Sequence, residues 1–423
     1  MSHSQTDTMH APLIADLVRP GDTLLWGAGQ AEPLDLIRRL NGEIEQLPDP
    51  CHAVLGLTYT DTLDAARFSA KVRVRAFGGA GTTRRFQDLG NFDALPMNYS
   101  VIPKAIASGV LRVDVALAQL APDGSGYNLG ILADYIADAI ATARVVVAEI
   151  NDQMPVTFGD TEVAPNRITR KIHVSRPPVD MPMSSPGDVE REIGRLIARL
   201  VPDGATLEVG LGKIPDAALA ALTDKRDLGV HSGTIGDGIV ALLEAGVITN
   251  AKKPIDTGLT VTAGILGTAR AYRWAHRNER LRVRSPRHTH NAAVMAGMPR
   301  FVGINTALEV DLTGQMNAET GGGRSIGMIG GHADFMRGAA LSDGGIGIVA
   351  MPATAKGGRI SSIVARLGDG VVTTARGDAD IVVTEYGIAE LKGRSVSERA
   401  RVLIAIAHPD FRAALAKAAD RLI

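Results

Sequence analysis

Short, near-continuous apolar runs alternate along this chain with segments whose apolar residues recur at helical spacing. Runs such as Val145–Ala148 and Ile346–Ala350 are typical of strands buried on both faces of a parallel sheet. The segment from Ile193 to Leu200 instead places its large apolar residues three and four positions apart, which indicates one buried helix face. This alternation predicts right-handed β-α-β units, in which ligands bind beyond the carboxyl ends of the strands.

A proline-rich stretch from Arg176 to Gly187 interrupts this pattern. Its four prolines disfavour both helix and central strand. Ser185 and Pro186 then have the residue types of a helix cap and a first helical position, so we expect a helix to begin there. The stretch predicts two domains, residues 1–182 and 183–423.

The sequences on the two sides of this linker echo each other. Gly21–Gly29 matches Gly204–Gly212, and in both a strand runs into a Gly-x-Gly loop before a helix. Later, Ala143–Glu149 matches Ala379–Glu385 in the same order. We therefore expect an α/β protein made of two tandem domains of one fold, which face each other across a cleft. Each would be built on a mostly parallel sheet with helices on its faces.

Composition narrows the range of partners. The 423 residues include 45 basic and 46 acidic ones, for a net charge of −1, so no global field favours nucleic acid or a membrane surface. Cys51 is the one cysteine, which fits a reducing compartment, and no apolar run approaches the roughly 20 residues that span a bilayer. We expect a cytoplasmic protein that binds neither nucleic acid nor membrane. Seven arginines between Arg270 and Arg287 are interpreted as a solvated surface that faces a partner.

Two glycine-rich loops carry the candidate chemistry. The glycines of Glu208–Gly212 let the backbone approach a ligand, and the helix that follows offers free N–H groups to an oxyanion. Glu208 is expected to point into the cleft, where acids and bases often act. In Gly229–Gly236, the strand periodicity places His231 and Gly233 on one face. His231 is a catalytic candidate that could orient a carboxylate or water, and a structural, hydrogen-bonded histidine is the favoured alternative.

His288 and His290 are interpreted as two imidazoles on one strand face. No matching carboxylate or cysteine accompanies them in the sequence, so we expect no metal site there.

These two loops, together with four later phrases, resemble the acetyl-CoA hydrolase/transferase family, whose members include 4-hydroxybutyrate CoA-transferases. The later phrases are Ala307–Gln315, Gly330–Phe335, Thr384–Ala389 and Ala407–Arg412. The resemblance implies a nucleophilic glutamate two residues after the loop histidine, a position that Gly233 occupies here. A glycine cannot form the acyl-enzyme intermediate of that family.

The resemblance also implies roles for other residues. The family's loop that contacts coenzyme A (CoA) and the thioester oxygen corresponds to Glu208, Val209, Gly210, Leu211 and Gly212. Gly330 and Gly331 would lie along the pantetheine, and Lys356 near the CoA phosphates. Glu208 stands where relatives usually carry glutamine, and it could serve as substitute nucleophile or as general base.

By this resemblance the chain acts on a small acyl-CoA, by CoA transfer to a carboxylic acid or by hydrolysis. The partners would be the acyl-CoA and either a small acid or water. CoA would be a substrate, with no permanently bound cofactor, and the protein would be a homo-oligomer. The first domain would hold the acyl group and acceptor, and the second the CoA. Two alternatives stay open at this point: a CoA-binding protein without turnover, and a diverged acyl-CoA cyclase or isomerase.

Overall fold

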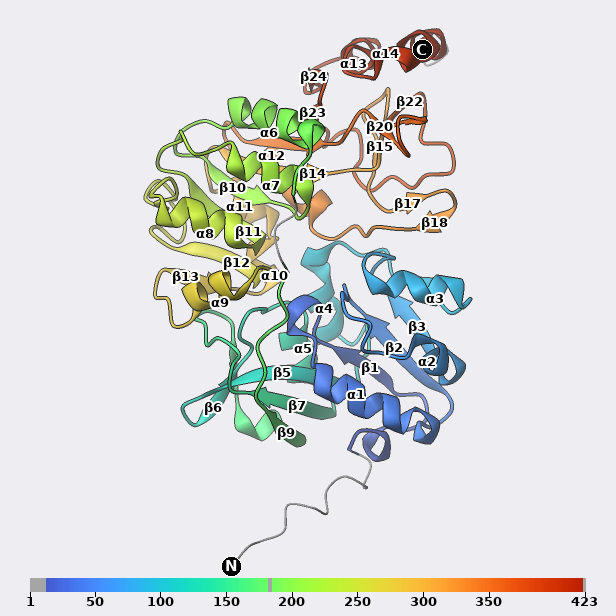
Figure 1. The fold of residues 1–423 in the computed structure, drawn as a ribbon, viewed down its shortest axis with the longest axis vertical. Coiled ribbons are helices and arrows are strands. Elements are labelled where there is room, and N and C mark those ends of the chain that lie inside the picture. Colours follow the sequence, from blue (N-terminus) through green and yellow to red (C-terminus); the bar gives the residue numbers. More distant parts are fainter. Residues whose placement is uncertain (1–12, 182–184, 421–423) are drawn as a thin grey trace, which may run out of the picture.

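The computed structural model describes residues 13–181 and 185–420, and within them the strands form two large sheets (Figure 1). In the first sheet, β1 is flanked by β2 and β5, and parallel pairings extend this core to β4 on one side and β9 on the other. A short antiparallel extension, β6 and β8, continues from β5. The strands of this sheet are β1 (Thr23–Trp26), β2 (Cys51–Leu55), β3 (Val72–Ala76), β4 (Asp93–Ala94), β5 (Val115–Asp123), β6 (Gly126–Asn128), β7 (Val145–Asn151), β8 (Glu162–Val163) and β9 (Arg170–Val174).

The second sheet repeats this arrangement. Its strand order is β13-β12-β11-β10-β14-β19-β23-β24, and all pairings except the last are parallel. Its strands are β10 (Thr206–Val209), β11 (Gly229–Ile235), β12 (Thr260–Ile265), β13 (Leu281–Val283), β14 (Phe301–Thr306), β19 (Ile346–Ala350), β23 (Ile381–Thr384) and β24 (Gly387–Glu390). In both sheets the first strand therefore has the second strand on one side and a later strand on the other. The predicted fold class, two mostly parallel α/β units, is confirmed.

Small strands lie outside these two sheets, beyond β14 and β19 in the second half. They are β15 (Glu309–Asp311), β16 (Met316–Asn317), β17 (Thr320–Gly321), β18 (Arg324–Ser325), β20 (Thr354–Ala355), β21 (Ile360–Ser361) and β22 (Ile363–Val364). Helices surround both sheets, and α13 and α14 lie at the end of the molecule farthest from the first half (Figure 1). The helices are α1 (Leu34–Glu43), α2 (Ala65–Lys71), α3 (Arg85–Asp88), α4 (Ile102–Ala107), α5 (Ile136–Thr142), α6 (Asp188–Leu200), α7 (Lys213–Ala220), α8 (Asp237–Glu244), α9 (Ala269–Ala275), α10 (Pro286–Thr289), α11 (Ala292–Ala296), α12 (His332–Leu341), α13 (Val396–Ala405) and α14 (Pro409–Ala419).

The two halves are joined by direct backbone contacts. The end of β12 pairs with the segment before α5, where Ala133 N donates to Ala263 O and Ile265 N donates to Ile131 O. A single hydrophobic cluster contains buried residues of both sheets, such as Leu25 and Leu207. The joint is therefore a packed core, and a side chain positioned by one half can be held rigidly against the other.

The linker departs from the sequence expectation in one detail. Helix α6 begins at Asp188, with Gly187 as its N-cap, and the Gly187 N–H donates to the Glu190 carboxylate. The expected cap at Ser185 is therefore wrong by two residues, because the carboxylate of Glu190 accepts from the backbone at Gly187 instead. The boundary between residues 182 and 183 lies among residues outside the described ones and stays a prediction. No helix within residues 13–181 and 185–420 is long and apolar enough to cross a bilayer.

Candidate active site

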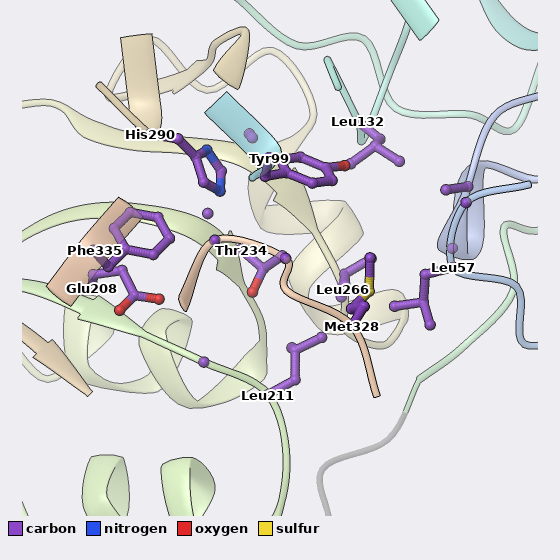
Figure 2. Close-up of a pocket in the computed structure, with 18 of the residues that line it drawn as sticks. Leu57, Tyr99, Leu132, Glu208, Leu211, Thr234, Leu266, His290, Met328 and Phe335 are labelled. Carbon is purple, nitrogen blue, oxygen red and sulfur yellow. The ribbon is translucent and has the colours of Figure 1, made fainter. Parts of the chain in front are cut away.

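A pocket lies where the carboxyl ends of the central strands of the two sheets meet. Its volume is about 200 Å³, and both halves contribute to its walls. Residues of the first half include Gly29, Leu57 and Tyr99, and residues of the second include Glu208 and Gly233. Figure 2 shows two sides of this pocket: Glu208, Thr234, His290 and Phe335 gather on one, and Leu57, Leu132, Leu266 and Met328 on the other. The pocket is thus polar at one end and apolar at the other.

Glu208 lies in β10, and its side chain is 2% exposed. Its Oε2 accepts a hydrogen bond from Asn305 Nδ2 at 2.6 Å. Burial raises the pKa of Glu208 to about 8, although the Asn305 hydrogen bond opposes that rise. The carboxyl group is therefore protonated at neutral pH, and can donate a hydrogen bond from the oxygen that Asn305 does not hold.

The loop after Glu208 turns directly into α7, with Gly212 as its N-cap at φ 118°. Gly210 N–H donates to Ile304 O at 2.9 Å, so it is already used within the sheet. Within the loop expected to contact the thioester oxygen, the Gly210 N–H is therefore not available for that contact. Leu211 and Gly212 N–H have no backbone acceptor among the described residues. Together with the first-turn N–H groups of α7, these two groups could bind an anionic oxygen at this end of the helix.

Gly233 and His231 lie on β11 and both face α10 and its C-terminal end, at different depths. A Cβ atom placed on Gly233 would come within 3.0 Å of His290 Nε2 and 3.2 Å of Phe335 Cε2. Gly233 lines the pocket, whereas His231 is fully buried beneath it and is not part of the lining. His231 Nε2 lies 3.1 Å from Thr289 O, and burial lowers the pKa of this histidine to about 3. A neutral histidine in this position holds α10 against β11.

Three aromatic rings line the pocket beside Gly233. The His290 ring centroid lies 4.9 Å from that of Tyr99 and 4.6 Å from that of Phe335. Tyr99 comes from the first half of the chain and Phe335 from α12 of the second. The stack therefore joins both halves at the polar end of the pocket.

Gly330 and Gly331 form part of the wall between the halves. Tyr99 N–H donates to Gly330 O at 3.0 Å, which ties this turn to the first half. Next to it, the Asp334 carboxylate accepts hydrogen bonds from Ser100 N and Ser100 Oγ. Gly330 has a φ of 55°, a conformation that favours glycine.

Comparisons with known proteins agree with this geometry. Residues 267–419 match the model of the acetyl-CoA hydrolase/transferase C-terminal domain. The chain is 41% identical over 338 residues to the 4-hydroxybutyrate coenzyme A transferase of Clostridium kluyveri, which covers 79% of each protein. This chain belongs to the acetyl-CoA hydrolase/transferase family.

Two further relatives extend the match over nearly the whole chain. The succinyl-CoA:cyclohexane-1-carboxylate CoA transferase of Geobacter metallireducens is 34% identical over 415 residues, with 96% of this chain and 94% of that protein covered. The crystal structure of RipA from Yersinia pestis superposes with a TM-score of 0.89 at 30% identity, covering 96% of this chain and 95% of that one. The CoA-transferase fold therefore accounts for both halves.

The structure brings together most of the residues that the sequence singled out. Those that line the pocket are Glu208, Gly210, Leu211, Gly233, Gly330 and Gly331. Val209 and Gly212 instead line a smaller adjoining pocket, which shares Gly210 and Leu211 with the first. Lys356 is not among the lining residues: it is exposed, in the turn between β20 and β21.

The strand assigned to His288 and His290 is wrong. These residues belong to helix α10 and its C-cap, because Ser285 Oγ accepts from Arg287 N and Pro286 occupies the first helical turn. The carboxylate thought to be missing is Asp256, whose Oδ2 lies 2.8 Å from His288 Nε2. His231, Asp256 and His288 together form a cluster that could hold a metal ion. Asp256 also faces Arg284 and Lys253, so the cluster already carries positive charge.

Part of the arginine-rich segment, expected to be a solvated surface that faces a partner, contributes to the contact between the two halves, although most of its arginines are exposed. Three of its arginines pair with carboxylates of the first half of the chain: Arg277 with Asp123 at 2.7 Å, Arg284 with Asp160 at 3.3 Å, and Arg287 with Asp138 at 2.6 Å. Sequence alone could not show this, because the pairs join positions more than 120 residues apart.

Several lining residues were missed by sequence reasoning. They are Tyr99, His290, Asn305 and Phe335, and the apolar residues of the first half such as Leu57 and Leu132. The Ser285–Pro286 pair was a readable signal for α10, since it combines an N-cap residue with proline at the first helical position. A prediction of α10 from this pair would have placed His290 at the C-terminal end of a short helix.

Proposed function

We propose that this protein hydrolyses small, apolar acyl-CoA thioesters without forming a covalent intermediate at residue 233. The observation that carries the proposal is the composition of the pocket. Among the described lining residues, Glu208 is the one carboxyl group, and position 233, where the family resemblance places the nucleophile, is a glycine. With no carboxylate to accept the acyl group at 233, water becomes the acceptor.

Glu208 is better suited to act as an acid than as the nucleophile or base considered from the sequence. Its pKa of about 8 keeps it protonated at neutral pH, and a protonated carboxyl group is a weak nucleophile. Its free O–H can instead bind the thioester oxygen together with Leu211 and Gly212 N–H. Such donors stabilise the oxyanion that develops during attack on the carbonyl carbon.

The lining also supports a substrate class. No lysine or arginine is among the described lining residues, so a carboxylate on the acyl group or on an acceptor acid would find no cationic partner. The opposite side is formed by Leu57, Leu132, Leu266 and Met328. A cavity of about 150 Å³ holds a benzene molecule. The pocket, with about 200 Å³, therefore suits an uncharged acyl group about as large as benzene.

The remaining expectations belong to this proposal. The pantetheine would pass Gly330 and Gly331, and Lys356 would meet the phosphates at the protein surface. The acyl group would lie toward the first half of the chain and the CoA toward the second. We place the reaction in the cytoplasm, as the single cysteine suggested, and expect a second copy of the chain as partner by analogy with the family.

Release of free CoA thiol tests the proposal. Acetyl-, butyryl-, hexanoyl-, benzoyl- and succinyl-CoA would each be incubated with the protein, with and without acetate. We expect thiol release without acetate, fastest for an apolar acyl group and slowest for succinyl-CoA. Release that requires acetate would establish CoA transfer, the activity named for the relatives. Thermal stabilisation by CoA with no release from any thioester would establish a binding protein.

A further inference from the structure

His290 occupies the room that a side chain at position 233 would need. The distance from its Nε2 to a Cβ on Gly233 would be 3.0 Å, and to a Cβ on Gly331 it would be 2.7 Å. The ring thus fits only because both positions are glycine. It is 4% exposed and lines the pocket, held between Tyr99 and Phe335 (Figure 2). A nitrogen atom therefore lies next to the place that the family gives to its nucleophilic carboxylate.

The neighbouring threonine contacts one of the two ring nitrogens of His290. Thr289 Oγ1 donates to Ser285 O at 3.4 Å, as threonine commonly does one turn back along a helix. The same oxygen lies 2.9 Å from His290 Nδ1, and we assign the hydrogen of this contact to Nδ1, the tautomer that the proposal below requires. The lone pair of the neutral imidazole is then on Nε2, and it is directed toward Gly233 and Gly331.

His290 Nε2 has no hydrogen-bond partner among the described residues, although Nδ1 of the same ring has one. An acceptor nitrogen at a pocket wall is satisfied when a water molecule or substrate group donates to it. Near Gly233 that donor would lie at the polar end of the pocket, which also holds Glu208. The pocket thus presents an acid, an acceptor nitrogen and a side-chain-free position together.

We propose that His290 is the catalytic base that takes a proton from the attacking water. This inference rests on the proposed hydrolysis. The water oxygen forms a bond to the thioester carbon while its proton passes to Nε2, and the carbonyl electrons move onto the oxygen held by Glu208 and the loop N–H groups. When this intermediate collapses, the C–S bond breaks and the thiolate takes the proton from the imidazolium. A carboxylic acid and CoA thiol leave, and His290 returns to its neutral form.

Two substitutions separate the loss of the base from the loss of packing. His290→Gln keeps a hydrogen-bonding group but cannot take the proton, and His290→Phe keeps a ring between Tyr99 and Phe335 but has no lone pair. His173→Gln, on the exposed strand β9, is the matched control. The best thioester of the panel would be used to measure kcat and KM, and CoA binding and thermal unfolding would show that each variant is folded.

We expect both His290 variants to lower kcat by about 10²- to 10⁴-fold, the range for removal of a general base, with little change in KM or CoA binding. His173→Gln should match the wild type. Folded His290 variants that keep wild-type kcat, or that change only KM, would overturn the role of His290 while leaving hydrolysis established. Absence of hydrolysis in the wild type would overturn the proposed function itself, so the two failures are distinguishable.

Discussion

The two halves of this chain have similar strand orders, but the N-terminal end of the helix after the first strand is capped in one half and not in the other. In the first half, the N-terminus of α1 is closed: Asp35 N and Leu36 N donate to Glu149 Oε2 at 2.7 and 3.1 Å. Arg176 pairs with the other oxygen of this fully buried carboxylate. In the second half, no side chain among the described residues caps the N-cap position of α7, and the loop before this helix borders the pocket.

Two pairs of corresponding positions differ between the halves in what their side chains do. Glu149 corresponds in the sequence echo to Glu385, whose Oε2 accepts from Ala353 N at 2.8 Å instead of from α7. Leu25, a core residue of β1, corresponds to Glu208. In the first half the carboxylate caps the helix and a leucine fills the core, whereas in the second the helix end is open and a carboxyl faces the pocket. The same strand order is thus combined with a buried structural carboxylate in one half and a pocket-facing carboxyl group in the other.

The largest expected effect on stability comes from removing the charge of Glu149, which caps α1 and pairs with Arg176. Glu149→Gln would leave the Arg176 guanidinium without its buried partner, although Asp35 still faces it at 2.9 Å. Removal of one member of a buried pair costs about 3–5 kcal/mol. Since Asp35 remains, we expect a loss of about 3 kcal/mol in the free energy of unfolding, measured by denaturant titration.

Glu385→Gln is the matched control for this experiment. The residue is half-buried, and its amide oxygen could still accept from Ala353 N. We expect a loss below about 1 kcal/mol, the net value of an ordinary hydrogen bond. Equal losses in the two variants would contradict the claim that the two carboxylates have different roles.

For the second half, in which Glu208 faces the pocket, we expect substitution to lower kcat. Glu208→Gln removes the O–H that we assign to the thioester oxygen, and loss of one such donor costs about 10²- to 10³-fold in kcat. In the wild type, activity should fall as pH rises through about 8, because the carboxyl then loses its proton. Activity that rises across this interval would instead identify Glu208 as a base or nucleophile.

The same substitution should change how stability depends on pH. Between the ordinary pKa of 4.5 and about 8, folded Glu208 keeps a proton that the unfolded chain has released. The folded state then binds more protons, so the free energy of unfolding falls as pH rises across this interval. Glu208→Gln should flatten that slope, as measured by denaturant titrations from pH 5 to 9. A slope that is the same in both proteins would contradict the raised pKa.

Sequence reasoning located the parts of this molecule that depend on local pattern. The apolar runs at Val145 and Ile346 are the parallel strands β7 and β19, and the two Gly-x-Gly loops follow the central strands β1 and β10. It failed where long-range packing decides. The Gly210 N–H is used by Ile304 of a strand nearly 100 residues away, and His290 reaches the pocket only because α10 packs against β11. Neither contact has a local signature.

A smaller effect tests the crowding at the open site. Gly233 is not in the left-handed region, so its backbone accepts a side chain. A methyl group there would press on His290 Nε2 and Phe335, and overpacking of this kind costs about 1–3 kcal/mol. We expect Gly233→Ala to lower the free energy of unfolding by about 1 kcal/mol, and by less in a His290→Ala background. An equal loss in both backgrounds would show that His290 does not fill this room.

The smallest effect concerns the joint that holds the two halves in register. Arg277 and Asp123 pair at 2.7 Å, but their side chains are 53% and 31% exposed, so solvent screens the pair. Exposed pairs contribute about 0.2–1 kcal/mol. We expect Arg277→Gln to lower the free energy of unfolding within that range, less so at high salt, and to leave hydrolysis unchanged because the packed core still joins the halves. A large fall in kcat would mean that this surface ion pair, and not the packed core, sets the geometry of the pocket between the two halves.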